Sequence, residues 1–595
     1  MSDRKIKYHF IYSRNRLLWP KSSFKNFVFA NNQVISDLSE EEKKIFLESE
    51  TINHHWMDRS KFAQDFKSLE NSYEKFLINL SNKLNTYHGE NFPLSYWRML
   101  LGPWLWFFSV RVYDYFSTLE ELRRDKRNFV TTISSSRDGD ANYVPNGAKD
   151  FFEYLESVEW NEAIYSHLIK NFYSNDFEIE FIPILKDNTM PVRPKKSQIR
   201  KDKIRKFLGH FQKYIARKDK YFLLNTYLPR DDLKEILKDL GQKTIVWKEI
   251  PPFQAKDLLK NRDWILEFNS DDKFEKIMEI MIPLHFPILY LEGYSRLKNQ
   301  IRSLPWPKDP KVIFTSNSFF SDDVFKFWAA DKINSGAELV IGQHGGSYGI
   351  GLFLWNEAHE IEISKKWLSW GWAKPNKSVV PVGNFKNRKE NEDNNHRGGM
   401  LHVLSGPSNY PVTYPFPIDK QWDEYFENQL DFFNHIDKKI SDISLIRFDR
   451  RTLNNAITSY WFKNIKDNFK YTATEVDNGD SKFGDILSNY RICVVTYNAT
   501  TFLETLSMDF PTIIFWNIKH WEIRSDAKPY FEILESVGIF HRSYKSAAIH
   551  INSIWDDVSG WWNSKNVQNA KKKFISNYSL ISKDTNKKII KALIG

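Results

Sequence analysis

A glycine-rich stretch, VIGQHGGSYG at residues 340–349, has the clearest potential for chemistry. It follows a short apolar run that predicts a strand. Glycines at such a point let backbone N–H groups come close to an anionic or sugar ligand. His344 could be a general base or an anion donor there, and a glycine-rich turn with a structural histidine is an equally good interpretation. No Gly-Lys-Ser/Thr follows, which excludes a phosphate-binding P-loop.

A second candidate is TYNATTFLETL at residues 496–506, after the apolar run RICVV. Thr500 and Thr501 begin a predicted helix, and their hydroxyls and the first helical amides could hold a phosphate. Glu504 lies one turn further and could accept hydrogen bonds from two ribose hydroxyls. An N-cap at Thr500 with Glu504 as its capping-box partner explains the same residues without a ligand.

Two further candidates lie near predicted strand ends. In LSGPSNY (404–410), Ser405, Gly406 and Ser408 could contact a ligand or form an ordinary tight turn. Arg447, in LIRFDRR, suits phosphate binding, although a lone arginine there is more often part of a surface ion pair.

The carboxylates that could transfer a proton follow the glycine-rich stretch. In NEAHEIEIS (356–364), Glu357 and Glu360 are candidates for acid or base catalysis. The alternation EIEI is typical of a half-exposed strand, which is the simpler interpretation of Glu362. No His, Cys or Asp cluster has convincing metal-ligand spacing, so we expect no metal site, and the pair in INHHWMD (52–58) is isolated.

These candidates must be positioned by secondary structure, and the pattern along the chain indicates an α/β fold. The pattern in residues 1–177 predicts mostly helices. Further along the chain, Ser321 is predicted to be the N-cap of a helix in SDDVFKFWAADKINSG. Alternating strands and helices begin near residue 178 and begin again near residue 400. The predicted strands are 178–185, 221–228, 243–250, 311–319 and 337–343, and then 400–406, 443–448, 491–497 and 511–516; the second half has predicted helices near 418–437 and 451–466.

We therefore expect two doubly wound, Rossmann-like domains with a helical N-terminal elaboration. The expected parts are a helical region at 1–177, a first α/β domain at 178–385, a linker at 386–398 and a second α/β domain at 399–595. Ligands of such sheets lie beyond the carboxyl ends of the strands, which is where the candidate residues fall.

Composition narrows the class of partner. The chain has 595 residues, a net charge of +10 and one cysteine, Cys493. The charge suggests an anionic partner, such as a phosphorylated substrate or an anionic membrane surface, and no nucleic-acid-binding signature is present. The most apolar segment, 99–110, is too short to span a bilayer, and no signal core follows the start. We expect a cytoplasmic protein, with peripheral contact at the inner face of the membrane as an open alternative.

The chain resembles transferases encoded in bacterial O-antigen and capsule gene clusters, and the layout resembles GT-B glycosyltransferases. The resembling segments span nearly the whole chain. They are YHGENFPLSYWRMLLGPWLWFF (87–108), TSNSFFSDDVFKFWAA (315–330), LVIGQHGGSYG (339–349), HEIEISKKWLSWGW (359–372), VVTYNATTFLETL (494–506) and PTIIFWNIKHWEIRSDAKPYFEILESVGIFH (511–541). The extreme N-terminus departs from the family's usual opening.

This resemblance implies glycosyl transfer in surface polysaccharide assembly. It implies a nucleotide-sugar donor, for which we expect a CMP-activated acid such as Kdo or pseudaminic acid. It also implies a glycan or lipid-linked glycan acceptor and no obligatory cofactor or metal. Nucleic acid is not an implied partner. The residues that it assigns to the cleft or the nucleotide are Gln343, His344, Gly345, Gly346, Tyr497, Asn498, Thr500, Thr501 and Glu504.

The same resemblance extends past the strand at 511–516, where His520 or Arg524 could meet the charge of the donor and Trp521 could stack on a sugar or simply pack. The expected reaction is displacement at an anomeric carbon, with His344, Glu357 or Glu360 deprotonating the acceptor. Whether the anomeric configuration is retained stays open. Transfer of a polyol phosphate and non-catalytic glycan binding are the two alternatives.

Overall fold

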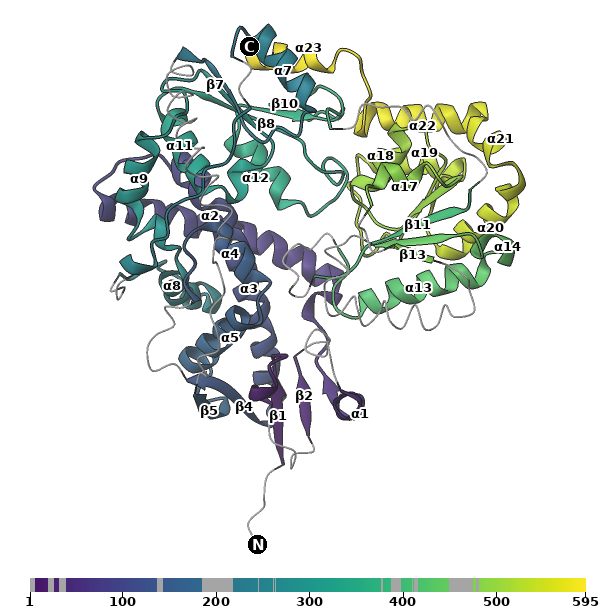
Figure 1. Cartoon of the computed structure of the whole chain (residues 1–595). Coiled ribbons are helices and arrows are strands. Elements are labelled where there is room, and N and C mark those ends of the chain that lie inside the picture. Colours follow the sequence, from purple (N-terminus) through teal and green to yellow (C-terminus); the bar gives the residue numbers. More distant parts are fainter. Residues whose placement is uncertain are drawn as a thin grey trace, which may run out of the picture.

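The computed structural model describes residues 6–19, 26–30, 39–135, 143–183, 218–243, 246–259, 262, 264–375, 378–386, 398–408, 410, 416–448, 475–477 and 481–595. Within them lie three β-sheets, each built only from parallel strand pairs and each accompanied by helices (Figure 1). The predicted α/β class, with parallel sheets in both halves of the chain, is confirmed.

The first sheet lies in the N-terminal part of the chain, at the bottom of Figure 1. Its strand order is β3-β2-β1-β4-β5. The strands are β1 (Lys7–Ile11), β2 (Phe27–Phe29), β3 (Glu50–Thr51), β4 (Asn128–Ser135) and β5 (Phe177–Pro183), and the helices are α1 (Glu40–Leu47), α2 (Arg59–His88), α3 (Leu94–Asp125), α4 (Ala148–Leu155) and α5 (Val158–Phe172).

The prediction of a mostly helical region at 1–177 is right for α2 and α3 but misses this sheet. Strands β2 and β3 have only three and two residues, which is too short to show a strand period in the sequence. The strand predicted at 178–185 exists as β5, but it pairs with β4 and so belongs to the first sheet. The domain boundaries themselves stay predictions.

Helix α3 carries the apolar segment that the sequence singles out, and its side chains are buried by packing. Trp97 and Trp104 have no exposed surface, and α3 packs against α2 and against α11 (Asp323–Asn334). Gly102 is needed on α3 because a Cβ there would lie 2.3 Å from His359 Cε1. No helix in the described part of the chain is long and apolar enough to cross a membrane.

The second sheet has the strand order β10-β9-β8-β7-β6. Its strands are β6 (Tyr221–Leu223), β7 (Val312–Thr315), β8 (Glu338–Gly342), β9 (Lys366–Ser369) and β10 (Val379–Pro381). The helices in this part are α7 (Arg230–Asp239), α8 (Lys273–His285), α9 (Tyr294–Arg302), α10 (Ser318–Ser321), α11 (Asp323–Asn334) and α12 (Trp355–Ile363).

Three local predictions in this part are wrong. The described residues among 243–250 form no strand. The segment EIEI is the end of α12, where Glu357 and Glu360 lie on the buried face at helical spacing and Glu362 is exposed. The N-cap of α11 is Asp322 and not Ser321, since the Asp322 side chain accepts the Phe325 N–H. A carboxylate at this position also interacts favourably with the helix dipole.

The third sheet lies in the C-terminal part and has the order β13-β12-β11-β14-β15-β16. Its strands are β11 (Met400–Leu404), β12 (Leu445–Phe448), β13 (Glu475–Asp477), β14 (Ile492–Val495), β15 (Thr512–Phe515) and β16 (Phe540–His541). The helices are α13 (Gln421–His435), α14 (Lys438–Ser441), α17 (Phe483–Leu487), α18 (Thr500–Ser507), α19 (Lys528–Ser536), α20 (Tyr544–Ile554), α21 (Val558–Asn563), α22 (Lys565–Tyr578) and α23 (Thr585–Ile594). The helix predicted near 451–466 and residues 387–397 of the predicted linker lie outside the described residues.

The end of the chain returns to the second sheet. Helix α23 packs against α7, and Asn586 donates hydrogen bonds to Asp232 and Glu235 of α7 at 3.1 and 2.7 Å. The Lys366 ammonium on β9 donates to the Ala592 carbonyl at 2.6 Å. The second and third sheets are therefore tied together by the C-terminal segment as well as by the contacts of the site described next.

Candidate functional site

The two glycine- and threonine-bearing motifs of the sequence meet in space. We call residues 343–349 the glycine loop; it follows β8 and touches the N-terminus of α18. The Gly346 N–H donates to the Thr500 hydroxyl at 3.1 Å, although the residues are 154 positions apart. A Cβ on Gly346 would lie 2.4 Å from the Ala499 carbonyl oxygen, so the approach requires glycine.

The N-terminus of α18 has no side-chain cap. Its N-cap residue is Ala499, and Thr500 is the first helical residue. Glu504 does not return to the helix start; its Oε1 lies 3.3 Å from the Lys386 ammonium. The capping-box interpretation of these residues is therefore wrong. A helix start of this kind presents N–H groups and the positive end of the helix dipole.

His344 lies half-buried in the glycine loop. Its Nε2 is 3.1 Å from the Tyr348 hydroxyl, and its ring stacks on Tyr227 with a centroid distance of 6.1 Å. Burial, helped by the charge of Lys386, lowers the pKa of His344 to about 4. The imidazole is therefore neutral at pH 7 and can accept a proton from a bound group.

Glu360 lies behind His344 in the interior and is 1% exposed. The Tyr348 hydroxyl donates to its Oε1 at 2.6 Å, and the Trp367 indole N–H donates to its Oε2 at 3.0 Å. Burial raises the pKa of this carboxyl to about 8. The structure thus brings the predicted catalytic residue Glu360 to His344 through one hydroxyl, without exposing it to a ligand.

Glu357 joins the glycine loop to the third sheet. Its Oε2 accepts the Gly349 N–H at 2.7 Å, and its Oε1 pairs with Lys374 at 2.6 Å and Arg524 at 3.0 Å. Next to this contact, Gly351 and Ile523 form an antiparallel bridge. With both oxygens occupied, the contacts favour an anchoring role for Glu357 and for Arg524.

Gln343 holds the base of the glycine loop and is fully buried. Its Oε1 accepts the Trp370 backbone N–H at 2.9 Å and the Trp372 indole N–H at 3.0 Å, while its Nε2 donates to the Gly345 carbonyl at 2.8 Å. Gly345 itself has room, since a Cβ there would first meet the Tyr348 ring at 3.4 Å. These contacts favour a role for Gln343 in shaping the glycine loop.

The remaining α18 candidates lie around its start. The Tyr497 and Thr501 hydroxyls are 2.7 Å apart, and Asn498 is buried, with no hydrogen-bond partner for its Oδ1 within the described part of the structure. The Ser405 N–H donates to the Tyr425 hydroxyl, which lies 2.6 Å from Thr496 Oγ1. The turn after β11 thus lies beside the end of β14.

Two other candidates, Ser408 and Arg447, have partners that explain them without a ligand. The Ser408 hydroxyl donates to Glu156 at 2.8 Å, and Gly406 lies half-buried between Ser405 and Ser408. Arg447 pairs with Asp477 on β13 and donates to the Ser481 carbonyl at 2.8 Å. Arg447 is therefore not brought to the glycine loop, and the ion-pair alternative is favoured for it.

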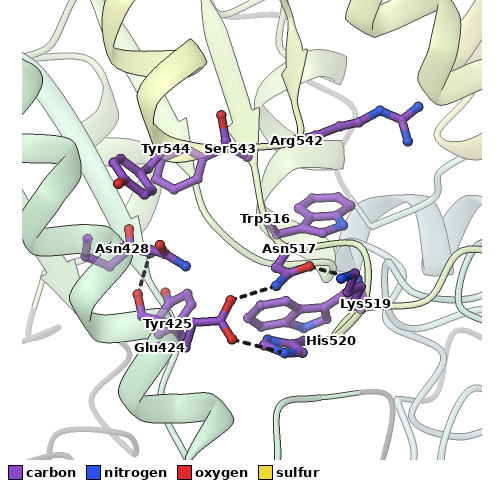
Figure 2. Close-up of a pocket in the computed structure, with 13 residues that line it drawn as sticks. Glu424, Tyr425, Asn428, Trp516, Asn517, Lys519, His520, Arg542, Ser543 and Tyr544 are labelled. Atoms are coloured by element: carbon purple, nitrogen blue, oxygen red, sulfur yellow. Dashed lines mark hydrogen bonds and ion pairs between the residues drawn. The ribbon is translucent and has the colours of Figure 1, made fainter. Parts of the chain in front are cut away.

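His520 lines a separate hollow of about 240 Å³ at the carboxyl ends of β15 and β16 (Figure 2). Its Nε2 lies 3.5 Å from Glu424, whose carboxylate also accepts from Asn517 at 2.8 Å. Burial lowers the pKa of His520. Trp521 is buried and packs against Trp422 and Tyr425, which favours packing over sugar stacking.

Sequence reasoning missed Tyr348 within the glycine loop and Lys386 beside it. Tyr348 lies four positions after His344 in the same stretch. A hydroxyl so close in sequence could have been predicted as a hydrogen-bond partner of the histidine. Lys386 was placed at the edge of the predicted linker, where no local pattern marks it. Its backbone is fixed because the Lys386 N–H donates to Asn384 Oδ1 at 3.0 Å, and Asn384 bonds to Ser579 at 2.9 Å.

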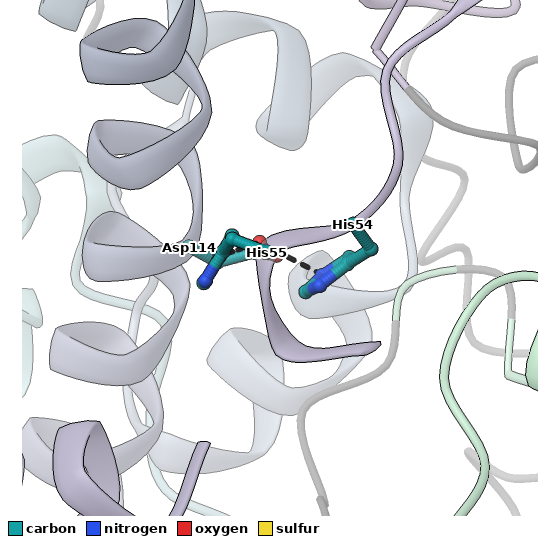
Figure 3. A group of neighbouring side chains, drawn as sticks. All are labelled: His54, His55 and Asp114. Atoms are coloured by element: carbon teal, nitrogen blue, oxygen red, sulfur yellow. Dashed lines mark hydrogen bonds and ion pairs between the residues drawn. The ribbon is translucent and has the colours of Figure 1, made fainter. Parts of the chain in front are cut away.

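The histidine pair of INHHWMD does form a cluster, with Asp114 of α3 (Figure 3). His54 Nε2 and His55 Nε2 lie 3.0 and 3.1 Å from Asp114 Oδ1. The Trp56 N–H donates to His54 Nδ1, so a neutral His54 carries its proton on Nε2 and offers no lone pair toward Asp114. Arg111 also lies 3.4 Å from Asp114, and these contacts favour polar packing over a metal centre.

Comparison with known proteins places the chain among transferases. No curated protein matches it at a significant level. Among solved structures it is similar to Acinetobacter baumannii MurG (10% identity, TM-score 0.33, 63% of this chain and 99% of that one) and to Anabaena Alr3699/HepE in complex with UDP and glucose (10%, 0.35, 63% and 98%). It is also similar to WaaG, a glycosyltransferase involved in lipopolysaccharide biosynthesis (9%, 0.29, 63% and 99%). TM-scores this low do not establish a shared fold.

The family comparison covers almost the whole chain. The sequence profile described as LIC12162 family transferase matches residues 8–593. The glycine loop, α18 and the segment after β15 all lie inside that match. The chain belongs to the LIC12162 family of transferases.

Proposed function

We propose that this chain is a GT-B-type glycosyltransferase that moves a sugar from a nucleotide donor to a glycan acceptor in bacterial surface polysaccharide synthesis. The observation that carries the proposal is the contact between Gly346 and Thr500. It joins the glycine loop, which follows β8 of the second sheet, to the uncapped N-terminus of α18, which follows β14 of the third sheet. Membership in a transferase family supports group transfer as the activity.

The nucleotide phosphate would lie at the start of α18. The first N–H groups of this helix and the Thr500 and Thr501 hydroxyls can donate to phosphate oxygens. The Lys386 ammonium adds a cation within reach of the same region, because it lies 3.3 Å from Glu504 one turn further along α18. Fixed N–H groups and a cation stabilise the charge that builds up on a leaving phosphate, so these residues alone can support departure of the nucleotide.

His344 would deprotonate the acceptor hydroxyl. It is neutral at pH 7, because its pKa is held at about 4, and it lies on the loop that reaches α18. Attack of the acceptor oxygen on the anomeric carbon then forms the new glycosidic bond as the bond to the nucleotide phosphate breaks. Glu357 and Arg524 would hold the loop against the segment after β15 during this step.

The donor class that we favour is a CMP-activated acidic sugar of the Kdo or pseudaminic type. The basic balance of the chain, +10, suits a donor that carries charge on both sugar and nucleotide. The acceptor would be a glycan or a lipid-linked glycan, with the protein at the cytoplasmic face of the membrane. These finer assignments rest on the resemblance of the sequence and on charge.

A thermal-shift screen tests the proposal. CMP-, UDP-, GDP- and dTDP-linked ligands are added to the full chain, and a ligand that binds only the native state raises its melting temperature. We expect CMP ligands to give the largest shift. A larger shift with another nucleotide corrects the donor. Glycan binding without any nucleotide effect would overturn transfer from a nucleotide sugar.

A further inference from the structure

Three side chains form a continuous path from the glycine loop into the interior. His344 Nε2 lies 3.1 Å from the Tyr348 hydroxyl, and that hydroxyl lies 2.6 Å from Glu360 Oε1. Exposure falls along the path, since Tyr348 is 6% and Glu360 1% exposed. The path therefore runs from the partly exposed His344, whose Nδ1 is buried and has no hydrogen-bond partner among the described residues, to a carboxyl that solvent does not reach.

The hydroxyl of Tyr348 sets the direction of these hydrogen bonds. A phenol has one proton, and Tyr348 donates it to the Glu360 carboxylate. When Glu360 is ionised, above its pKa of about 8, the Tyr348 oxygen accepts the proton on His344 Nε2. A neutral imidazole with its proton on Nε2 keeps the lone pair on Nδ1. Ionised Glu360 thus selects, through Tyr348, the form of His344 that accepts a proton at Nδ1.

The two ends of the path differ in how well they hold a proton. Burial and the charge of Lys386 keep the pKa of His344 at about 4, so it releases a proton readily. Burial raises the pKa of Glu360 to about 8, so it retains one. A proton that enters at His344 is therefore more stable at Glu360.

We propose that Tyr348 and Glu360 are positioning residues that carry the proton taken up by His344 into the interior. The inference rests on the proposed glycosyl transfer. The acceptor hydroxyl gives its proton to His344 Nδ1, Nε2 passes its proton to the Tyr348 oxygen, and Tyr348 passes its own to Glu360 Oε1. The acceptor oxygen bonds to the anomeric carbon, and the electron pair of the broken bond leaves with the nucleotide phosphate. Glu360 later returns its proton to solvent by the same path.

The groups around the path keep it in this arrangement. The Trp367 indole on β9 holds Glu360 Oε2, which leaves Oε1 for Tyr348. The charged and titratable neighbours are Tyr227, stacked on His344, Lys386 after β10, and Glu357 on α12 with its partners Lys374 and Arg524. Glu357 raises the pKa of Glu360 further, after burial, and so favours proton uptake there.

The first test needs no substrate. The full chain is prepared with ¹⁵N-labelled histidine, and the His344 signals are assigned with His344→Gln and followed against pH. In the wild type we expect the His344 shifts to change near pH 8, where Glu360 ionises, as well as near pH 4. Tyr348→Phe and Glu360→Gln should each remove the change near pH 8. Tyr73→Phe, which deletes a buried hydroxyl outside the path, should keep it.

A change near pH 8 that survives in Tyr348→Phe would overturn the proposal, as would its absence in the wild type. Thermal unfolding of each variant shows that it is folded. If Glu360→Gln does not fold, Tyr348→Phe carries the test alone, because it keeps the ring that packs against Trp367.

The second test measures transfer with whichever nucleotide sugar the screen identifies. We expect kcat of the wild type to rise with pH to a plateau above about pH 8, as Glu360 becomes free to take up a proton. Glu360→Gln should lower kcat at least about tenfold, leave KM little changed and lose the rise. An unaltered pH profile in Glu360→Gln would overturn the path. Coupled His344 signals without any transfer would reject the proposed function and leave the path intact.

Discussion

The backbone N–H of Gly346 and the hydroxyl of Thr500 are joined by a hydrogen bond of 3.1 Å that links the second and third sheets. Each residue begins a feature suited to anions, a glycine loop on one side and an uncapped helix on the other. The loop and the helix can approach this closely only because residue 346 has no Cβ. Substitutions that add or remove single groups at Gly346 and Thr500 therefore test the contact.

Gly346→Ala should damage this contact. Its Cβ would lie 2.4 Å from the Ala499 carbonyl, so the loop or the helix must move. We expect a loss of about 1–3 kcal/mol in the free energy of unfolding, measured by denaturant titration. Gly345→Ala is the matched control, because its Cβ first meets a ring at 3.4 Å, and it should change stability by less than about 1 kcal/mol. Equal losses in the two variants would contradict the packing described here.

Thr500→Val should weaken nucleotide binding while keeping the shape of the side chain. The Gly346 N–H loses its acceptor, and the helix start loses a hydroxyl. We expect about 1 kcal/mol weaker binding by calorimetry. Thr501→Ala should cost about 1 kcal/mol if that hydroxyl holds phosphate. Affinity that is unchanged in both variants would remove the threonines from the site.

Glu357→Gln should loosen the glycine loop. Glu357 is buried and pairs with Lys374 and Arg524, so a neutral amide leaves two partly exposed cations without their charge partner. We expect a loss of about 2 kcal/mol in the free energy of unfolding. Glu362→Gln on the same helix is exposed and should be neutral within about 0.5 kcal/mol. A neutral result for Glu357→Gln would show that the ion pairs do not stabilise the junction.

Acid should destabilise the chain through its buried histidines. Burial lowers the pKa of His359 to about 3. Its unfolded value is near 6.5, so the unfolded chain binds more protons and stability falls as pH drops from 6.5 toward 3. His359→Leu should remove this share, so the stability gap between variant and wild type changes by roughly 2 kcal/mol between pH 6.5 and about pH 5. His435→Leu, at an exposed histidine, is the control, and its stability difference from the wild type should change little with pH. A difference between His359→Leu and the wild type that stays constant with pH would contradict the burial of His359.

Much of the fold could be predicted because its strands are continuous buried runs. VIFT at β7, ICVV at β14 and TIIF at β15 are fully buried, and each is followed by turn residues and a helix. Of the first sheet only β5 was predicted, because β2 and β3 are too short to show any period and β4 is separated from them by two long helices.

The site could be predicted by residue type but not by partner. His344, Gly346 and Thr500 stand out because they follow strands, and parallel strands present their carboxyl ends at one edge. Which of these residues are in contact depends on how the second and third sheets are placed relative to each other. The spacing of residues along the sequence does not determine that placement. Arg447 shows the limit: its position at a strand end looked suitable for phosphate, but its partner Asp477 comes from the neighbouring strand.

The central claim is that an activated anionic sugar binds where the glycine loop meets α18. Hydrogen–deuterium exchange of the full chain, with and without the nucleotide that raises the melting temperature most, tests it directly. We predict slower exchange in peptides covering 343–349 and 499–504, and unchanged exchange in 445–448, where Arg447 lies. Protection confined to other segments, with both of these peptides unaffected, would contradict the claim.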